Sequence, residues 1–324
     1  MANGKILRQL IKAGTNGDVS AFRHISKAVI QEERQKQHHL LANDLEQILY
    51  RQQSSTVRNS KEKITLKAPV DKEKGLPLLD IKLCQRPVDE LILSASGLAS
   101  IEETLEEHRR ADVLRSHGLQ PVGKVIFYGP PGCGKTMAAE VIAFELDRPL
   151  AIVRLDALVS SFLGETATNL RKIFEFIAQH ELVVLFDEFD AIGKSRSDTT
   201  DHGELRRVVN AVLQMMDAYQ GNSLLLAATN YEQTLDTAIW RRFDEAINFP
   251  LPEATETEKI LTLKLRGVRR QFEVSDKPVI QLFAKRSGAE VERIIRRAIK
   301  QMILRRQEFL TLNMLEQAVS RENR

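Results

Sequence analysis

The chain has 324 residues, of which 43% are hydrophobic and 28% are charged, with a formal net charge of +3 at pH 7. This apolar share suffices for ordinary globular cores, and no internal repeat or low-complexity segment interrupts it. Two cysteines, Cys84 and Cys133, are too few for a disulfide framework and indicate a reducing compartment. No apolar run approaches the roughly 18 residues that cross a membrane, and the start lacks a signal-peptide pattern, so we expect a soluble, cytoplasmic protein without membrane insertion.

The N-terminal part is predicted to be separate from the rest of the chain. Residues 1–53 have the apolar spacing of a small helical bundle, which we expect to bind a partner or substrate. Residues 54–74 are polar and lysine-rich and are typical of a linker. Both ends are basic: residues 1–74 carry 14 Lys/Arg against 8 Asp/Glu, and residues 265–324 carry 14 against 7. Such ends fit nucleic acid or an acidic partner, and the alternative is solvated helical faces, because no recognition motif accompanies the charge.

A glycine-rich loop lies between a predicted strand at Val125–Tyr128 and a predicted helix at Met137–Glu145. Its pattern, G-x-x-x-x-G-K-T, is the one whose backbone N–H groups surround phosphate at a helix N-terminus. We therefore predict an ATP site, with Lys135 reaching the outer phosphates and Thr136 offering its hydroxyl to Mg²⁺. The residues that we expect to bind the cofactor here are Gly129, Pro130, Pro131, Gly132, Cys133, Gly134, Lys135, Thr136 and Met137.

A second segment, Leu182–Phe186, is a continuous apolar run followed by two acids. Such a run predicts a strand buried on both faces of a parallel sheet, and ligands of open α/β sheets bind at the carboxyl ends of strands. Asp187 is predicted to hold Mg²⁺, and Glu188 to orient and polarise the attacking water. The alternative is that the two acids cap the following turn.

Two further segments decide the kind of nucleotide-binding protein. Residues 223–230 predict another buried strand, and Asn230 after it is predicted to sense the γ-phosphate. Residues 235–244 end in Arg241-Arg242-Phe243-Asp244. Together with the glycine-rich loop and the acids, these segments resemble the AAA ATPase family, from about Leu76 to the C-terminus. The doublet Arg241-Arg242 is most similar to the spastin and katanin group, because the commonest form inserts Pro-Gly between the two arginines.

The resemblance implies a fold and domain bounds. The family has an α/β fold, a P-loop NTPase parallel sheet flanked by helices, which we expect over residues 75–251. A helical lid domain follows over residues 252–324, after the N-terminal helical bundle and the linker. In the lid, Gly288 and Ala289 match a turn that packs beside the adenine, and Glu290 stands where the family usually has Asp.

The resemblance also implies assembly. Arg242 matches an arginine finger and Arg241 a second finger, and such a guanidinium is supplied to the site of a neighbouring subunit. We therefore expect a homo-oligomeric ring, a hexamer in this family. The alternative is that both arginines are surface ion-pair partners, which contribute under about 1 kcal/mol.

A substrate-contacting loop is expected at Phe162, Leu163 and Gly164. Family members that thread polypeptides have an aromatic–aliphatic–glycine loop in the central pore, where a rigid aromatic grips an extended chain through apolar area. The alternative is that Phe162 is an ordinary core residue at a turn. A second pore-facing loop is considered at residues 193–202, with a plain surface loop as its alternative.

The predicted function is ATP hydrolysis at the subunit interfaces of a ring, coupled to unfolding, threading or remodelling of a protein client. The predicted cofactors are ATP and Mg²⁺, and the predicted partners are further copies of the chain and a client or effector at residues 1–53. The alternative is an ATP-dependent regulatory or nucleic-acid-coupled switch. Compact bacterial family members of similar build are encoded beside subtilisin-like proteases in defence operons, so the switch would control such a separate effector.

Overall fold

The computed structural model describes residues 25, 66–71, 75–154, 163–189, 211–231 and 237–322. Residues 67–324 form one compact unit, and residues 1–66 form another. Nearly all of residues 1–66 lie outside the described residues, so the N-terminal helical bundle and the linker bounds stay predictions. No helix among the described residues is long and apolar enough to cross a membrane.

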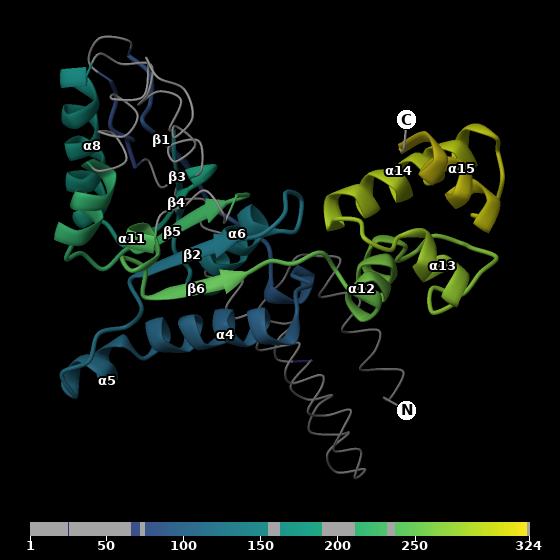
Figure 1. The fold of residues 1–324 in the computed structure, drawn as a ribbon, viewed down its shortest axis with the longest axis horizontal. Helices are drawn as coiled ribbons and strands as arrows, with labels where there is room; N and C mark the ends of the chain where they lie inside the picture. The colour runs from purple at the N-terminus through teal and green to yellow at the C-terminus, as the bar shows by residue number, and fades with distance from the viewer. Residues whose placement is uncertain are drawn as a thin grey trace. The chain divides into compact units, whose positions relative to one another are not determined.

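A six-stranded sheet forms the centre of the 67–324 unit (Figure 1). The strand order is β1-β3-β4-β5-β2-β6, and every neighbouring pair is parallel except β1 with β3. The mixed α/β fold and the mostly parallel sheet confirm the predicted fold class. The strands are β1 (Leu79–Lys82), β2 (Lys124–Tyr128), β3 (Leu150–Val153), β4 (Val183–Phe186), β5 (Leu224–Thr229) and β6 (Glu245–Asn248).

Helices cover both faces of this sheet, which explains why its central strands are apolar throughout. On one face, α4 (Ala95–Arg109) and α6 (Lys135–Glu145) share a core with alternate residues of β2, β4 and β5. On the other face, Phe174 of α8 (Leu163–Ala178) stacks on Phe186 at a ring-centroid distance of 6.2 Å. Burial on both faces makes all four residues of β4 and all six of β5 inaccessible to water.

A short hairpin precedes the sheet and packs on α8. Val70 bridges to Pro77, and the Leu78 amide donates to the Pro69 carbonyl oxygen at 2.8 Å. Asp71 is only 3% exposed, and Asn169 of α8 donates to its carboxylate at 3.2 Å. Residues 67–71, which composition alone assigns to the linker, therefore belong to the packed unit, because a buried hydrogen bond holds them there.

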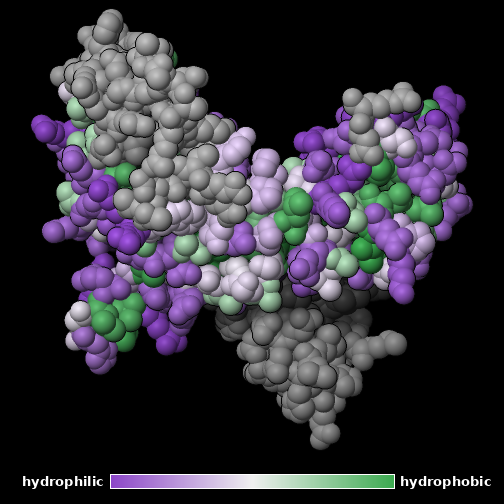
Figure 2. All heavy atoms as spheres, in the orientation of Figure 1, coloured by the Kyte–Doolittle hydropathy of each residue, from purple (hydrophilic) through white to green (hydrophobic). Residues whose placement is uncertain are grey.

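The C-terminal part contains four helices with a core of their own. They are α12 (Ala254–Lys264), α13 (Lys277–Leu282), α14 (Gly288–Leu304) and α15 (Leu312–Glu322), and apolar residues of all four share one cluster. The shorter elements of the unit are η2 (Val88–Glu90), α5 (Ala111–Ser116) and α11 (Thr237–Trp240). Figure 2 shows a mostly hydrophilic face with a small hydrophobic patch over α5, where Val113 is 49% exposed.

Candidate nucleotide site

Three strands of the sheet end side by side, and each is followed by a predicted site residue. Tyr128, the last residue of β2, pairs with Thr229, the last of β5, and Phe186 at the end of β4 pairs with Ala227. The glycine-rich loop, Asp187 and Asn230 therefore begin at the same edge of the sheet. This is the edge at which parallel α/β sheets bind ligands.

The backbone of the glycine-rich loop needs its glycines at particular places. Gly129 has φ of 135°, and a Cβ there would lie 2.3 Å from the carbonyl oxygen of Phe249. Gly134 caps α6 with φ of 101°, in the left-handed region that side chains disfavour. The loop therefore turns tightly from β2 into α6, and it leaves the first N–H groups of that helix facing the cavity described below.

Two side chains at the start of α6 hold the polar part of the site together. The Lys135 ammonium is buried with its residue 7% exposed, and it donates to the carbonyl oxygens of Gly129 and Pro130 at 2.7 and 2.8 Å. The Thr136 hydroxyl donates to a carboxylate oxygen of Asp187 at 3.0 Å. Hydroxyl and carboxylate oxygens at this spacing suit Mg²⁺, which prefers oxygen ligands.

Glu188 and Asn230 complete the polar edge. Asp187 accepts the Glu188 amide at 2.9 Å, and Glu188 has the left-handed φ of 51°, which is uncommon for a residue with a side chain. This turn leaves the Glu188 side chain exposed at the carboxyl end of β4. Asn230 follows β5 directly and lines the same cavity as Glu188. The arrangement brings together an acid, an amide and a cation at one cavity wall.

The start of α14 closes against the glycine-rich loop. The Ala289 amide donates to the Gly132 carbonyl oxygen at 3.0 Å, and a Cβ at Gly132 would lie 2.8 Å from the Ser287 hydroxyl oxygen. Ser287 caps α14, and Glu290 accepts both the amide and the hydroxyl of Ser287 at 2.8 Å. These two bonds lower the pKa of Glu290. Glu290 therefore has a structural task here, the closing of the helix cap.

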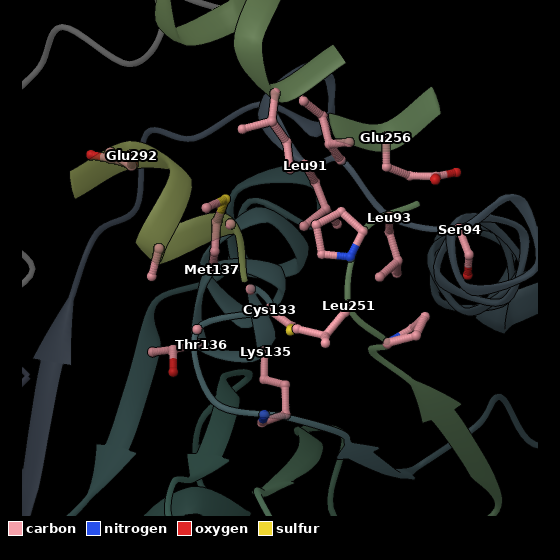
Figure 3. A pocket seen from close by; sticks show the side chains of 18 of the residues that line it. Leu91, Leu93, Ser94, Cys133, Lys135, Thr136, Met137, Leu251, Glu256 and Glu292 are labelled. Carbon is pink, nitrogen blue, oxygen red and sulfur yellow. The ribbon is translucent and has the colours of Figure 1, made fainter. Parts of the chain in front are cut away.

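Between these parts lies a cavity of about 690 Å³, within the usual range for small-molecule sites. Figure 3 shows Lys135 and Thr136 at one end of it and the apolar side chains of Leu91 and Leu93 toward the other. This apolar wall was not predicted from the sequence. A signal for it was present, because three consecutive apolar residues, Leu91, Ile92 and Leu93, directly precede Ser94, which caps α4. The missed lining residues include Leu91, Ile92, Leu93, Ser94, Leu251, Glu256, Ile260, Leu263, Lys264 and Glu292.

Basic residues of α14 are held in ion pairs. Arg293 and Arg297 contact the two carboxylate oxygens of Glu322 at 2.8 and 3.0 Å, and Arg296 contacts Glu292 at 2.5 Å. Glu292 also pairs with Lys264, whose hydrogen bond is the largest cause of the lowered pKa of Glu292. The three arginines of α14 thus have structural partners within the C-terminal helices, as expected of the charged face of an amphipathic helix.

The two predicted arginine fingers lie next to each other just beyond α11. Arg241 is exposed, and the Arg242 Nε lies 3.4 Å from a carboxylate oxygen of Asp217. Among the described residues, those that line the nucleotide cavity include neither arginine. The next two residues anchor the segment: Phe243 packs on Phe189, and Asp244 accepts the amides of Gly123 and Lys124 at 2.9 Å. These contacts of Phe243 and Asp244 therefore fix the position of the backbone next to Arg241 and Arg242.

The predicted pore loop is only partly described. Phe162 lies outside the described residues, and α8 begins with Leu163 and Gly164. The second segment considered for the pore, residues 193–202, also lies outside them. Both pore assignments stay predictions.

Comparison with known proteins agrees with this geometry. Residues 125–251 match the model of the ATPase family associated with various cellular activities (AAA). The AAA family ATPase y4kL of Sinorhizobium fredii is 40% identical over 309 residues, which are 95% of this chain and 92% of that protein. The chain belongs to the AAA ATPase family. It is accordingly an ATP hydrolase, and the family implies that it binds a nucleotide.

More distant relatives of this AAA ATPase bear a functional name. The proteasome-activating nucleotidase of Thermococcus onnurineus is 32% identical over 272 residues, 78% of this chain and 67% of that protein. The protein of that name from Thermococcus kodakarensis is 30% identical over 264 residues, 77% of this chain and 65% of that protein. The chain therefore spans about two thirds of the length of these nucleotidases.

Proposed function

We propose that this AAA ATPase binds ATP with Mg²⁺ in the cavity between the glycine-rich loop and α14, and hydrolyses it in a ring of identical subunits to unfold or remodel a protein client. The observation that carries the proposal is the hydrogen bond from Thr136 to Asp187. It joins the loop after β2 to the acid after β4, so that two oxygen ligands for Mg²⁺ stand beside a phosphate-binding backbone.

The site residues have distinct roles in this proposal. The loop amides and Lys135 hold the phosphates, and Thr136 and Asp187 hold Mg²⁺, which neutralises phosphate charge when bound. Glu188 orients the attacking water and Asn230 senses the γ-phosphate. The exposure of Glu188 supports its role, because an acid that positions water must be accessible to it. Gly288 and Ala289 line the same cavity, beside the base.

The position of the arginine doublet supports a ring. Arg241 and Arg242 do not line the cavity of their own chain among the described residues, yet the Asp244 anchor and the Phe243 contact hold the doublet firmly. Arg241 is exposed beside the half-buried Arg242, and an exposed guanidinium on a firmly held segment is suited to the phosphate of a neighbouring copy. In a closed ring, every copy supplies one such doublet to one neighbour and receives one from the other. Head-to-tail contacts of this kind form rings when the rotation between copies closes.

The names of the relatives support work on proteins. A proteasome-activating nucleotidase, by its name, acts on a proteasome, and about 30% identity over three quarters of this chain makes a protein client the favoured object. In the proposal, Phe162, Leu163 and Gly164 grip the client, and residues 1–53 recruit it. The linker, placed at 54–74 by composition and shortened by the packing of residues 67–71, and the domain bounds at 75–251 and 252–324 belong to the same proposal.

A regulatory ATPase is the second candidate. The name of the nucleotidase relatives describes a protein that activates a separate assembly, so control of an independent effector is also consistent with the similarity. In that case ATP would switch the ring between states, and the effector, such as a subtilisin-like protease, would be the dedicated partner. Nucleic acid at the basic ends is a further outcome of the experiment below.

The test is the steady-state ATPase rate of the full chain over a range of protein concentrations, with an unfolded protein, DNA or RNA added. We expect a rate per subunit that rises with concentration and increases further with unfolded protein. Phe162→Ala should keep the basal rate and lose the stimulation, while Phe176→Ala, at an aromatic position on α8 away from the loop, is the matched control. A constant rate per subunit from a protein that sediments as a monomer would contradict the ring, and stimulation only by nucleic acid would contradict the protein client.

A further inference from the structure

A second cavity lies at the opposite edge of the sheet from the nucleotide site. It has a volume of about 610 Å³ and is formed at the amino ends of β2 and β5. Its walls come from six parts of the chain: the end of α4, α5, the start of β2, the turn after α6, the loop before β5 and Asp244 just before β6. The nucleotide site, by contrast, uses the carboxyl ends of the strands. The two cavities are thus separate features of one domain.

Three cations line this amino-edge cavity: Arg115, Lys124 and Arg148. Asn222 holds both guanidinium groups. Arg115 donates to its side-chain oxygen at 2.7 Å, and Arg148 donates to its carbonyl oxygen at 3.1 Å. The Arg148 side chain is only 15% exposed. The two guanidinium groups therefore converge on one short segment and are held in place before any ligand arrives.

A neutral histidine further fixes Arg148. The Nε2 atom of His108 lies 2.7 Å from the Val122 carbonyl oxygen, which accepts only, so Nε2 carries the hydrogen. This leaves Nδ1 to accept from Arg148 at 3.3 Å. Burial is the main cause that lowers the pKa of His108, and the neighbouring Arg148 lowers it further. The neutral ring thus acts as an acceptor that orients the guanidinium.

The carboxylates near the cavity are fewer than the cations that line it. Asp244 is the one carboxylate among the lining residues, and its Oδ2 already accepts the amides of Gly123 and Lys124. Glu181 lies 3.6 Å from Arg148, but its side chain is 63% exposed. No carboxylate of the described residues forms an ion pair with Arg115 or Lys124. The wall consequently has an excess of positive charge within the part of the chain that the structure describes.

We propose that the amino-edge cavity is a second ligand site, which takes a small phosphate-bearing anion. Two planar guanidinium groups held on one residue suit the geometry of a phosphate group, which accepts paired N–H bonds from arginine. The volume lies in the usual range for small-molecule sites. The site goes beyond the proposed function, since it needs neither a ring nor a client.

The position of the cavity connects such a ligand to the predicted arginine fingers. Asp244, in the cavity wall, follows Arg241, Arg242 and Phe243 directly in the chain. A ligand that moves Lys124 would also move the Lys124 amide, which donates to Asp244. The shift would pass through Asp244 to the segment that contains Arg241 and Arg242. An effect on ATP hydrolysis would rest on the proposed trans role of the arginines, whereas binding itself would not.

The test is calorimetric titration of inorganic pyrophosphate into the full chain after stoichiometric ADP has filled the nucleotide cavity. We expect binding to the wild type, weakened about tenfold in Arg115→Gln and in Arg148→Gln, because each removes a charge-assisted bond to phosphate. Arg110→Gln is the matched control, since Arg110 is exposed near α5, pairs with Glu106 and does not line the cavity.

The outcomes separate this site from the nucleotide cavity. Binding that persists in Lys135→Ala and weakens in Arg115→Gln supports the proposal. No binding to the wild type up to about 10 mM pyrophosphate, or equal binding to Arg115→Gln and Arg110→Gln, would overturn it. Loss of binding in Lys135→Ala would assign the probe to the nucleotide cavity and would overturn it equally. Arg148→Gln removes a half-buried side chain and can lower stability. Arg115 is exposed on α5, so Arg115→Gln should fold normally and still decide the test.

Discussion

The Nε atom of Arg242 lies 3.4 Å from a carboxylate oxygen of Asp217 in the same chain, while the Nη1 atom of Arg242 is buried and has no hydrogen-bond partner among the described residues. This contact allows an experiment to decide whether Arg242 is an arginine finger or only an ion-pair partner of Asp217. If Arg242 is a finger, Arg242→Ala should lower the rate of ATP hydrolysis by about a thousandfold or more and leave ATP binding unchanged. Asp217→Ala removes the same ion pair but no finger, so its rate should stay within a few-fold of wild type.

Equal effects of the two variants would contradict the finger. If the ion pair is only structural, removing either partner breaks the same contact, so both variants should lose similar amounts of stability and of rate. Both losses should be small, because the pair is partly exposed. The measurement is kcat together with nucleotide affinity for both variants. Mixtures of Arg242→Ala with Glu188→Gln subunits should regain part of the rate when the finger acts in trans, and each variant alone should remain inactive.

Glu188→Gln should abolish turnover while ATP still binds. The substitution keeps the size of the side chain and the amide bond to Asp187, but it removes the charge that polarises water. The expected loss is about a hundredfold or more in kcat, with nucleotide affinity unchanged. Glu181→Gln is the matched control, since Glu181 is exposed and lies just before β4. A Glu188→Gln protein that hydrolyses ATP at the wild-type rate would contradict the assigned role.

The sequence predicted the sheet centre and the polar edge because local signals coincide there. The apolar runs at 182–186 and 223–229 correspond to β4 and β5, and the glycine pattern lies between β2 and α6 as expected. In each case one short segment contains both the strand and the residue that follows it. Position at the carboxyl end of a buried strand is a local property, and therefore it can be read from sequence.

The remaining parts depend on contacts between distant segments. β1 has only four residues, Leu79–Lys82, and its antiparallel pairing with β3 follows from packing rather than from a turn signal. Asp71 meets Asn169 across 98 residues of chain, which no pattern in either segment indicates. The apolar cavity wall at Leu91 and Leu93 likewise forms only because η2 and α12 come together around the glycine-rich loop.

Gly129→Ala should destabilise the protein strongly. Its φ of 135° disfavours any side chain, and the new Cβ would lie 2.3 Å from the Phe249 carbonyl oxygen, a backbone atom that cannot rotate away. We expect a loss of more than about 3 kcal/mol in the free energy of unfolding. Gly118→Ala is the control: its φ of 76° is also left-handed but nothing lies within 4 Å, so it should cost about 1–2 kcal/mol. Denaturant unfolding of both variants checks this, and equal losses would contradict the clash.

Cys133 should react slowly with thiol reagents at neutral pH and be protected by ATP. Burial raises the pKa of its thiol, so the reactive thiolate is scarce at pH 7 and increases above pH 9. Because Cys133 lies in the glycine-rich loop and lines the cavity, bound nucleotide should block it. In a Cys84→Ser protein Cys133 is the remaining cysteine, so the alkylation rate of that protein measures Cys133 alone. Protection that survives in Lys135→Ala at the same ATP concentration would contradict nucleotide binding at the loop.

The stability contributed by the α14 cap should disappear in acid. Hydrogen bonds from Ser287 lower the pKa of Glu290 below the ordinary value of 4.5, so the folded state holds fewer protons there than the unfolded state. The contribution is therefore complete above pH 4.5 and is lost as the pH falls through the lowered folded value. Glu290→Gln should reduce the free energy of unfolding at pH 7, and its difference from wild type should shrink toward zero as the pH falls through the lowered pKa of Glu290 in the folded state. Urea unfolding at several pH values measures this difference, with Glu316→Gln on the exposed face of α15 as the control. A Glu290→Gln deficit that is the same at every pH would show that the charge of Glu290 does not stabilise the cap.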